Sequence, residues 1–229
     1  METVISARGS RRLARRAPIA VDPTRAVAIK RDVHEYVVQA PAAELALALR
    51  AVVTDPASRF GLIRIKRPEE RMGAPFEVGE RFQGCFAIER AVPGWLGPVV
   101  RWRPIAWVVA RVEDLFLSNY AEIEAIDFTP APGEPYVLRY GYLKGTPIAG
   151  STTLLLQPLG PSRTRFVQVF EYQETDAMSV MTFQQFGLKF HDQVVHEEVR
   201  QAARRCGAVI ESGTIPTAYA LLAGAGMAA

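Results

Sequence analysis

The sequence lacks the short motifs that mark most enzymes with an activated nucleophile, a bound nucleotide or a catalytic zinc ion. It contains no GxSxG elbow, no GxGxxG, no phosphate-binding loop and no HExxH pair. Histidine is scarce, and His191 and His196 lie about 140° apart on a helix, whereas a helical metal pair needs a spacing of three or four residues. We therefore predict no cofactor and no metal site. We interpret these two histidines as solvated or locally hydrogen-bonded, and His34 as an ordinary surface residue.

Cysteine is also scarce, and long apolar runs are absent. Cys85 and Cys206 lie in apolar sequence without a CxxC pattern, so we expect buried free thiols and a reducing compartment. No uncharged apolar window reaches the roughly 18 residues that a membrane-spanning helix needs. The arginine-rich start lacks the apolar core of a secretory signal. Together these absences predict a cytoplasmic protein without a membrane span.

The formal charge of +3 is unevenly distributed along the chain. Residues 1–26 hold six arginines and two acidic residues, which makes +4, and the remainder is close to neutral with 21 basic and 22 acidic residues. A nucleic-acid-binding domain is expected to carry a basic patch on the domain itself, so we predict no nucleic-acid partner. We interpret residues 1–26 as a disordered, solvated tail, and contact with a membrane surface or an acidic partner is the alternative.

The 229 residues suffice for one domain with a full core. We divide the chain into the basic tail at 1–26, a domain at 27–209 and an apolar C-terminal tail at 210–229. A strand is predicted over 27–38, and a short helix that starts near Pro41 follows it. Alternating apolar residues predict further strands at 59–67, 79–89, 118–128, 136–144, 149–157 and 164–174. Their short, Gly- and Pro-rich connections predict an antiparallel meander.

Residues 91–111 interrupt this series of strands. They contain several Gly and Pro residues and all three tryptophans, Trp95, Trp102 and Trp107. We interpret them as a long excursion from the sheet whose aromatic side chains pack onto the domain. The alternatives are a flap over a cavity and a surface for a partner.

The segment Asp176–Cys206 has the longest amphipathic pattern in the chain and predicts the last helix, which ends before Gly207. Gln185 and Asp192 lie inside its sheet-facing apolar stripe. That stripe consists of Met181, Leu188, Val195, Val199, Ala202 and Cys206. A second stripe, formed by Phe183, Phe186, Phe190 and Val194, needs a cover from the excursion, the C-terminal tail or a second subunit. We favour a cover from the same chain over a homodimer.

The order of strand, short helix, meander and long terminal helix resembles the START-related helix-grip superfamily, which includes pollen-allergen-type carriers and bacterial polyketide cyclase and lipid-transport proteins. The segment 37–45, a strand ending in Ala-Pro before an acidic-apolar helix start, is similar to the opening of that superfamily. The segments 125–128, 136–140, 150–154 and 162–166 are similar to its meander. The resemblance implies an α+β fold, in which a curved antiparallel sheet wraps around the long C-terminal helix. Members bind sterols, lipids, plant hormones and aromatic polyketides, some catalyse cyclisation, dehydration or hydrolysis, and no set of catalytic residues is universal.

A helix laid across a curved sheet leaves a hollow, which predicts binding of a hydrophobic or aromatic small molecule such as a polyketide, a sterol or a lipid. The inward faces supply the expected lining: Phe82, Phe86, Gln168, Phe170, Tyr172, Met181, Gln185 and Leu188. The first alternative is a cofactor-independent polyketide cyclase or dehydratase, with Asp192 as the general base and Tyr140 or Tyr142 as the acid or enolate donor. The second alternative is a partner-recruiting module that uses the tryptophan-rich excursion. At this point both an enzyme and a carrier stay open.

Overall fold

The computed structural model describes residues 4–5, 13–54, 63–86, 96–116, 118–176 and 188–214. Within these ranges, nine strands form one sheet. The strands are β1 (Val4–Ile5), β2 (Lys30–Val38), β3 (Ile63–Pro68), β4 (Arg81–Phe86), β5 (Ser118–Asp127), β6 (Tyr136–Tyr142), β7 (Ile148–Gly160), β8 (Arg163–Glu174) and β9 (Ile210–Gly213). Their order across the sheet is β1-β3-β4-β5-β6-β7-β8-β2-β9.

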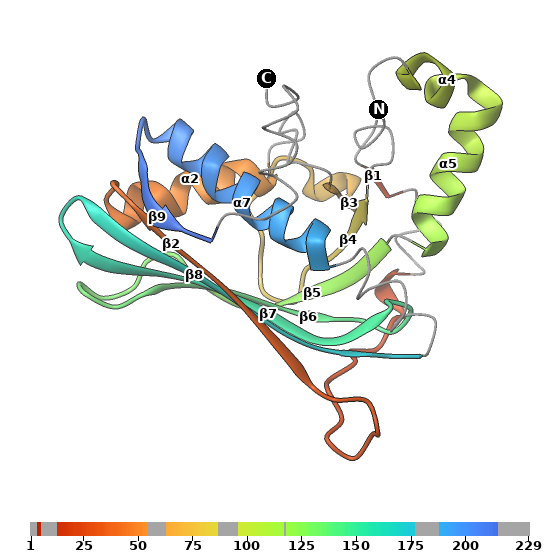
Figure 1. Ribbon diagram of the computed structural model, residues 1–229, viewed down its shortest axis with the longest axis horizontal. Coiled ribbons are helices and arrows are strands. Elements are labelled where there is room, and N and C mark those ends of the chain that lie inside the picture. Colours follow the sequence, from red (N-terminus) through yellow and green to blue (C-terminus); the bar gives the residue numbers. More distant parts are fainter. Residues whose placement is uncertain are drawn as a thin grey trace.

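The strands β3 to β8 follow one another as an antiparallel meander, which confirms the prediction. The longest pairing joins β7 to β8, from Ile148 opposite Glu174 to Gly160 opposite Arg163. The early strand β2 then pairs antiparallel with the last strand of the meander, β8. The resulting sheet is long and bent, with its concave side toward the helices (Figure 1).

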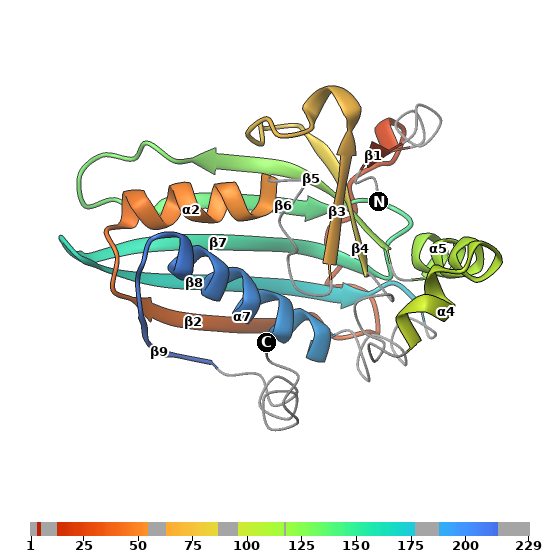
Figure 2. The same cartoon turned by 90° about the horizontal axis from the view of Figure 1, so that it is seen from above.

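Two helices, α2 (Ala42–Thr54) and α7 (Leu188–Arg205), lie side by side over the concave face (Figures 1 and 2). Pro41 precedes the first residue of α2, as expected for a helix start. Beyond α7, Gly207 has the positive φ of 63°, and its N–H donates to the Arg204 carbonyl at 3.1 Å. The predicted C-terminal stop and the α+β helix-grip architecture are confirmed. Residues 177–187 of the predicted last helix lie outside the described residues.

The N-terminal segment from residue 13 to residue 26 lies against the sheet, so the expectation of a solvated tail is wrong there. Leu13 is 3% exposed. The Ile19 N–H donates to the Tyr142 carbonyl at 2.9 Å, and the Ile19 carbonyl accepts from Gly150 at 3.0 Å. The Arg16 guanidinium stacks 3.6 Å from the centre of the Tyr120 ring. Apolar residues between the arginines, together with arginine stacking, hold this basic segment on the domain.

The predicted C-terminal tail also begins later than expected. Residues 210–213 form β9, which pairs antiparallel with β2 and extends the sheet beyond the predicted boundary at 209. Gly213 permits the close approach, because a Cβ atom there would lie 2.1 Å from the Tyr36 ring. The Tyr36 hydroxyl then donates to the Thr214 carbonyl at 2.6 Å.

The tryptophan-rich excursion contains two helices, α4 (Gly97–Arg101) and α5 (Arg103–Phe116). Pro98 and Pro104 each stand in a first turn, where the missing N–H costs nothing, so they start helices instead of interrupting structure. The expected packing is wrong for two tryptophans, because Trp102 is 64% and Trp107 71% exposed. Both helices project from one end of the sheet (Figure 1), and Trp95 lies outside the described residues. In the part of the chain that the structure describes, no helix has the length and apolar character needed to cross a membrane.

Candidate functional site

A narrow cleft opens between the two helices and the inner face of the meander. Helix α2 contributes Leu49, Arg50 and Val53, the strands and their connections contribute Phe76, Phe128, Tyr136, Leu138, Leu154 and Leu156, and α7 contributes Glu198. The unoccupied space, counted with the mouth, is about 430 Å³, but only about 20 Å³ is open to the centre of a water molecule. The latter is little more than one water needs. A ring-sized ligand therefore enters this cleft only when the lining side chains move apart.

Glu198 places a carboxyl group in this apolar surrounding. The residue is 4% exposed, and no described residue forms a hydrogen bond or ion pair with its side chain. Burial raises the pKa of the Glu198 carboxyl to about 8, because the charged form loses its hydration. The group is therefore mostly protonated at neutral pH and can act as a hydrogen-bond donor.

A row of aromatic rings crosses the sheet beside the cleft. The ring centres of Phe82 and Tyr140 are 5.6 Å apart, and those of Tyr140 and Tyr142 are 6.0 Å apart. Phe170 continues the row, 6.0 Å from Tyr142 and stacked at 4.5 Å on Tyr172. The prediction that these aromatic side chains face the interior is confirmed. These rings contact one another and fill the interior beneath them. The open cleft lies beside them, next to α2.

The two tyrosines of this row are hydroxyl donors. Burial raises the pKa of Tyr142 to about 12, and its hydroxyl lies 3.1 Å from that of Thr152. Burial, the neighbouring Tyr142 and the charge of Glu198 raise the pKa of Tyr140 well above its usual range. Both phenols keep their protons at neutral pH. The electrostatic link between Tyr140 and Glu198 joins the aromatic row to the acid of the cleft.

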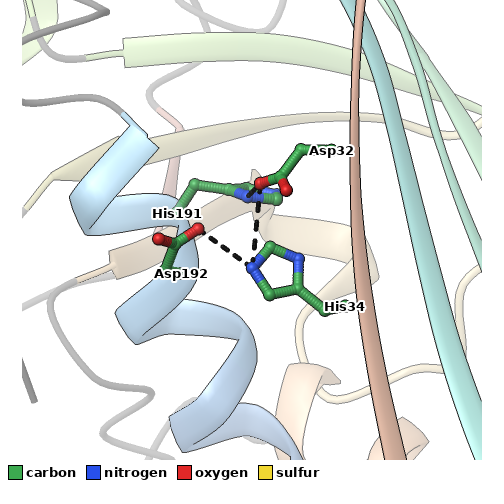
Figure 3. Close-up of side chains that lie close together, drawn as sticks. All are labelled: Asp32, His34, His191 and Asp192. Atoms are coloured by element: carbon green, nitrogen blue, oxygen red, sulfur yellow. Dashed lines mark hydrogen bonds and ion pairs between the residues drawn. The ribbon is translucent and has the colours of Figure 1, made fainter. Parts of the chain in front are cut away.

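A separate polar cluster joins β2 to α7 (Figure 3). Asp32 and His34 face α7 from alternate positions of β2, and α7 contributes His191 and Asp192. His34 Nε2 lies 2.9 Å from Asp192 Oδ1. His34 Nε2 and His191 Nδ1 each lie 3.7 Å from Asp32 Oδ2. The two imidazole rings meet edge to face, with centres 5.3 Å apart.

The interpretation of His34 as a surface residue is wrong, and so is the solvated alternative for His191. The His34 side chain is 2% exposed, so it is no surface residue. The His191 side chain is 15% exposed and packs at 4.4 Å between ring centres on Phe170. Burial lowers the pKa of His191, which favours the neutral ring. The neighbouring His191 ring holds the pKa of Asp32 below its usual range.

Asp192, the predicted general base, lies in this polar cluster. Its side chain is 34% exposed and pairs with His34. Among the described residues, no hydrogen bond or ion pair links Asp192 to Tyr140 or Tyr142. Tyr140 instead lies in the field of Glu198. The structure thus separates the predicted base from its predicted acids, and the catalytic roles of all three stay predictions.

The remaining predicted ligand contacts divide into two groups. Gln168 is 3% exposed, and its Oε1 accepts no hydrogen bond from any described residue. Leu188 packs on the cluster that contains Phe82, Phe170 and Tyr172. The other predictions lie outside what the structure describes: Met181, Gln185, Phe183 and Phe186, and the side chains of Phe86 and Phe190. The proposed cover or homodimer contact therefore stays a prediction.

Glu198 is the residue that the sequence analysis missed. It lies three residues after Val195 and four before Ala202, at the edge of the sheet-facing stripe. An acid in that position is the signal that could have indicated it. The approach of His34 to His191 has no comparable signal, because it depends on how α7 packs across β2.

No protein-family model matches the chain, and no curated protein matches it significantly. Similar solved structures include the Zhui aromatase/cyclase from Streptomyces sp. R1128, at 14% identity and a TM-score of 0.49 over 78% of this chain and 96% of that one. Norcoclaurine synthase from Thalictrum flavum matches at 12% identity and a TM-score of 0.46, over 82% and 96%. At these identities and scores the similarities carry no argument about function. The chain has a helix-grip fold. The strand order of its sheet and the placement of α2 and α7 show this fold.

Proposed function

We propose that the protein binds an apolar, ring-bearing small molecule in the cleft between α2, α7 and the meander. The observation that carries the proposal is a cleft lined mostly by apolar side chains, with Arg50 and one buried carboxyl group, Glu198, which makes no hydrogen bond or ion pair with a described residue. A carbonyl or hydroxyl group of a ligand would satisfy this carboxyl group. This favours a mostly apolar molecule with at least one oxygen, a description that polyketides and sterols both fit.

The shape of the cleft limits the size of this ligand. Its open space of about 20 Å³ lies far below the roughly 300–1,000 Å³ of preformed small-molecule sites, so the lining side chains must move apart for a ligand to enter. Phe76, Phe128 and Tyr136 contribute aromatic rings to the lining, which suit the flat faces of a ring system. We therefore favour a compact ring system over a long lipid chain.

Filling the cleft from β7 should weaken binding strongly. In Leu154→Trp the larger side chain enters the cleft, because Leu154 is 8% exposed and lines it. Leu155→Trp is the matched control, since side chains of neighbouring strand residues point to opposite faces. We expect wild type and Leu155→Trp to bind the neutral fluorophore N-phenyl-1-naphthylamine equally, and Leu154→Trp to bind at least about tenfold more weakly in a fluorescence titration.

Circular dichroism and thermal unfolding must first show that both tryptophan variants are folded. Equal affinity of all three proteins for the fluorophore, or no binding by folded wild type, contradicts the proposal.

Cofactor-independent proton transfer in the same cleft is the second candidate function. The observation that favours it is the Glu198 pKa of about 8, close to the pH at which a general base works best. Tyr140 carries a proton in the field of this carboxylate and can donate to a developing enolate. Glu198 would then remove a proton next to a ligand carbonyl. Whereas the sequence predicted Asp192 for this role, the burial of Glu198 suits it better.

Exchange of the acidic C–H protons of 2-tetralone in D₂O, followed by NMR, tests this activity. We expect the catalysed rate to rise through pH 8 and Glu198→Gln to lower it by about 100-fold or more. Glu197→Gln is the control, because that neighbouring carboxylate is held by Arg200 at 2.7 Å. Asp192→Asn tests the base predicted from sequence. A rate that Glu198→Gln leaves unchanged rules this second function out, and fluorophore binding would still test the first.

A further inference from the structure

We propose that Asp32, His34, His191 and Asp192 form a binding site for a divalent first-row transition-metal ion, with Zn²⁺ as the preferred probe. Each residue offers one ligand atom, and these four atoms lie within 4.8 Å of one another. Figure 3 shows the two carboxylates and the two imidazoles turned toward a common centre between β2 and α7. The site is distinct from the cleft that Glu198 lines, and the inference does not depend on the proposed ligand.

The separations of the ligand atoms are close to those that zinc imposes. Zn²⁺ binds His nitrogen and Asp oxygen at about 2.0–2.2 Å, so two ligands of a tetrahedral site lie about 3.3–3.5 Å apart. His34 Nε2 lies 2.9 Å from Asp192 Oδ1 and 3.7 Å from Asp32 Oδ2. His191 Nδ1 also lies 3.7 Å from Asp32 Oδ2. The Asp32 and Asp192 side chains are 32% and 34% exposed, so they have room to rotate and close the longer separations.

The histidines carry nitrogen atoms that the described residues leave unsatisfied. Both ring nitrogens of His191 are shielded from solvent and make no hydrogen bond to these residues, and Nδ1 has only the 3.7 Å contact with Asp32 Oδ2. A buried nitrogen without a partner is costly, and native proteins rarely leave both nitrogens of one ring in that state. Coordination of a metal by Nδ1 would give His191 a strong partner on the side that faces Asp32. This shortage separates the cluster from an ordinary network of ion pairs.

Charge and ligand type favour a transition metal over Mg²⁺ or Ca²⁺. Two carboxylates and two neutral imidazoles carry a charge of −2, which a divalent ion neutralises. Imidazole nitrogen suits Zn²⁺, Co²⁺, Ni²⁺ and Cu²⁺, whereas Mg²⁺ and Ca²⁺ prefer sites made of oxygen alone. The partial exposure of both aspartates gives an ion access from solvent.

A bound metal ion would have a structural effect, because its ligands come from two elements. Two ligands come from an inner strand near the sheet edge, β2, and two from the first turn of α7 in its described range. Four protein ligands make a closed site of the structural kind, with no position left for a substrate. A bound ion would hold the N-terminal end of the described part of α7 against β2.

The test uses the full chain without an affinity tag, stripped of metal by a chelator. Isothermal titration with Zn²⁺ should give one site per chain, and a large excess of ion over the dissociation constant should raise Tm by about 5 °C or more. Co²⁺ should give the visible absorption of a four-coordinate ion. Mg²⁺ and Ca²⁺ should have no effect at the same concentrations.

Matched variants locate the site. His191→Ala and the isosteric Asp32→Asn should each weaken Zn²⁺ binding by more than about tenfold and remove the rise in Tm. His196→Ala, five residues further along the same helix and outside the cluster, should leave both unchanged. Each variant is checked for wild-type circular dichroism, and Asp32→Asn decides the matter if His191→Ala does not fold. No Zn²⁺ binding by folded wild type, or binding that survives both cluster variants, overturns the proposal.

Discussion

Glu198→Gln is expected to stabilise the protein by up to about 5 kcal/mol at pH 8 and above, and to change its stability little at pH 4.5. The folded-state pKa of this carboxyl is about 8, against 4.5 for an ordinary glutamate. The stability associated with the neutral form is complete below pH 4.5 and is lost as the pH rises toward 8, because the unfolded chain ionises first. At about 1.36 kcal/mol per pH unit, this difference sets the upper limit of the effect. Glutamine has a similar shape and never ionises.

Urea unfolding of wild type and Glu198→Gln at several values between pH 4.5 and pH 9 measures this effect. The gap in unfolding free energy should widen steadily with pH. Glu197→Gln serves as the control, because the carboxylate of Glu197 already has Arg200 and Gln201 as partners at 2.7 Å and 2.9 Å. If the curves of Glu198→Gln and wild type run parallel over the whole range, the carboxyl is not buried as described.

Arg67→Met is expected to destabilise the protein by about 3 kcal/mol. The Arg67 and Glu80 side chains are 3% and 6% exposed, and they pair through two contacts of 2.6 Å and 2.9 Å. Arg67 also donates to the Ala74 carbonyl at 2.6 Å and lies 4.3 Å from the centre of the Phe76 ring. Removing one partner of a buried pair costs roughly 3–5 kcal/mol. We expect the lower value, because Arg71 still reaches Glu80 at 3.2 Å.

Chemical denaturation measures this loss, and Arg139→Met is the matched control. Arg139 pairs with Glu124 at 2.8 Å, but their side chains are 51% and 41% exposed. Exposed pairs contribute about 0–1 kcal/mol, so this variant should stay close to wild type. Since Phe76 lines the cleft, Arg67→Met should also weaken fluorophore binding. Equal stability losses in the two variants would show that Arg67 has no special role.

The sequence predicted most of the sheet because its alternation is local. In β8, Phe166, Gln168, Phe170 and Tyr172 are all buried as expected, and Arg165, Val167, Val169 and Glu171 between them are more exposed. The stop of α7 at Gly207 was likewise predictable, because a left-handed glycine after a basic last turn is a local signal. Periodicity and capping depend on neighbours in the chain, and a single sequence contains them.

The incorrect predictions for the N-terminal segment and for His34 concern features that depend on contacts between distant parts of the chain. Leu13 is buried only because the N-terminal segment returns to the sheet, and His34 is buried only because α7 crosses β2. A run of arginines indicates a tail, and a histidine on a first strand indicates a surface, until a partner from the far end of the chain covers it. The prediction missed α4 and α5 for a local reason. The Gly and Pro residues of 91–111 were interpreted as an interruption, although Pro98 and Pro104 occupy first turns of helices.

The central claim is that an apolar molecule meets the neutral Glu198 carboxyl in the cleft. Carbon-13 NMR of protein labelled at glutamate side-chain carboxyls, with the Glu198 signal assigned by its loss in Glu198→Gln, tests this most directly. A pH titration should give a pKa of about 8 for Glu198 in the free protein, and N-phenyl-1-naphthylamine should shift this signal but not that of Glu197. A pKa near 4.5, or a Glu198 signal that ignores the fluorophore while it binds, would contradict the account.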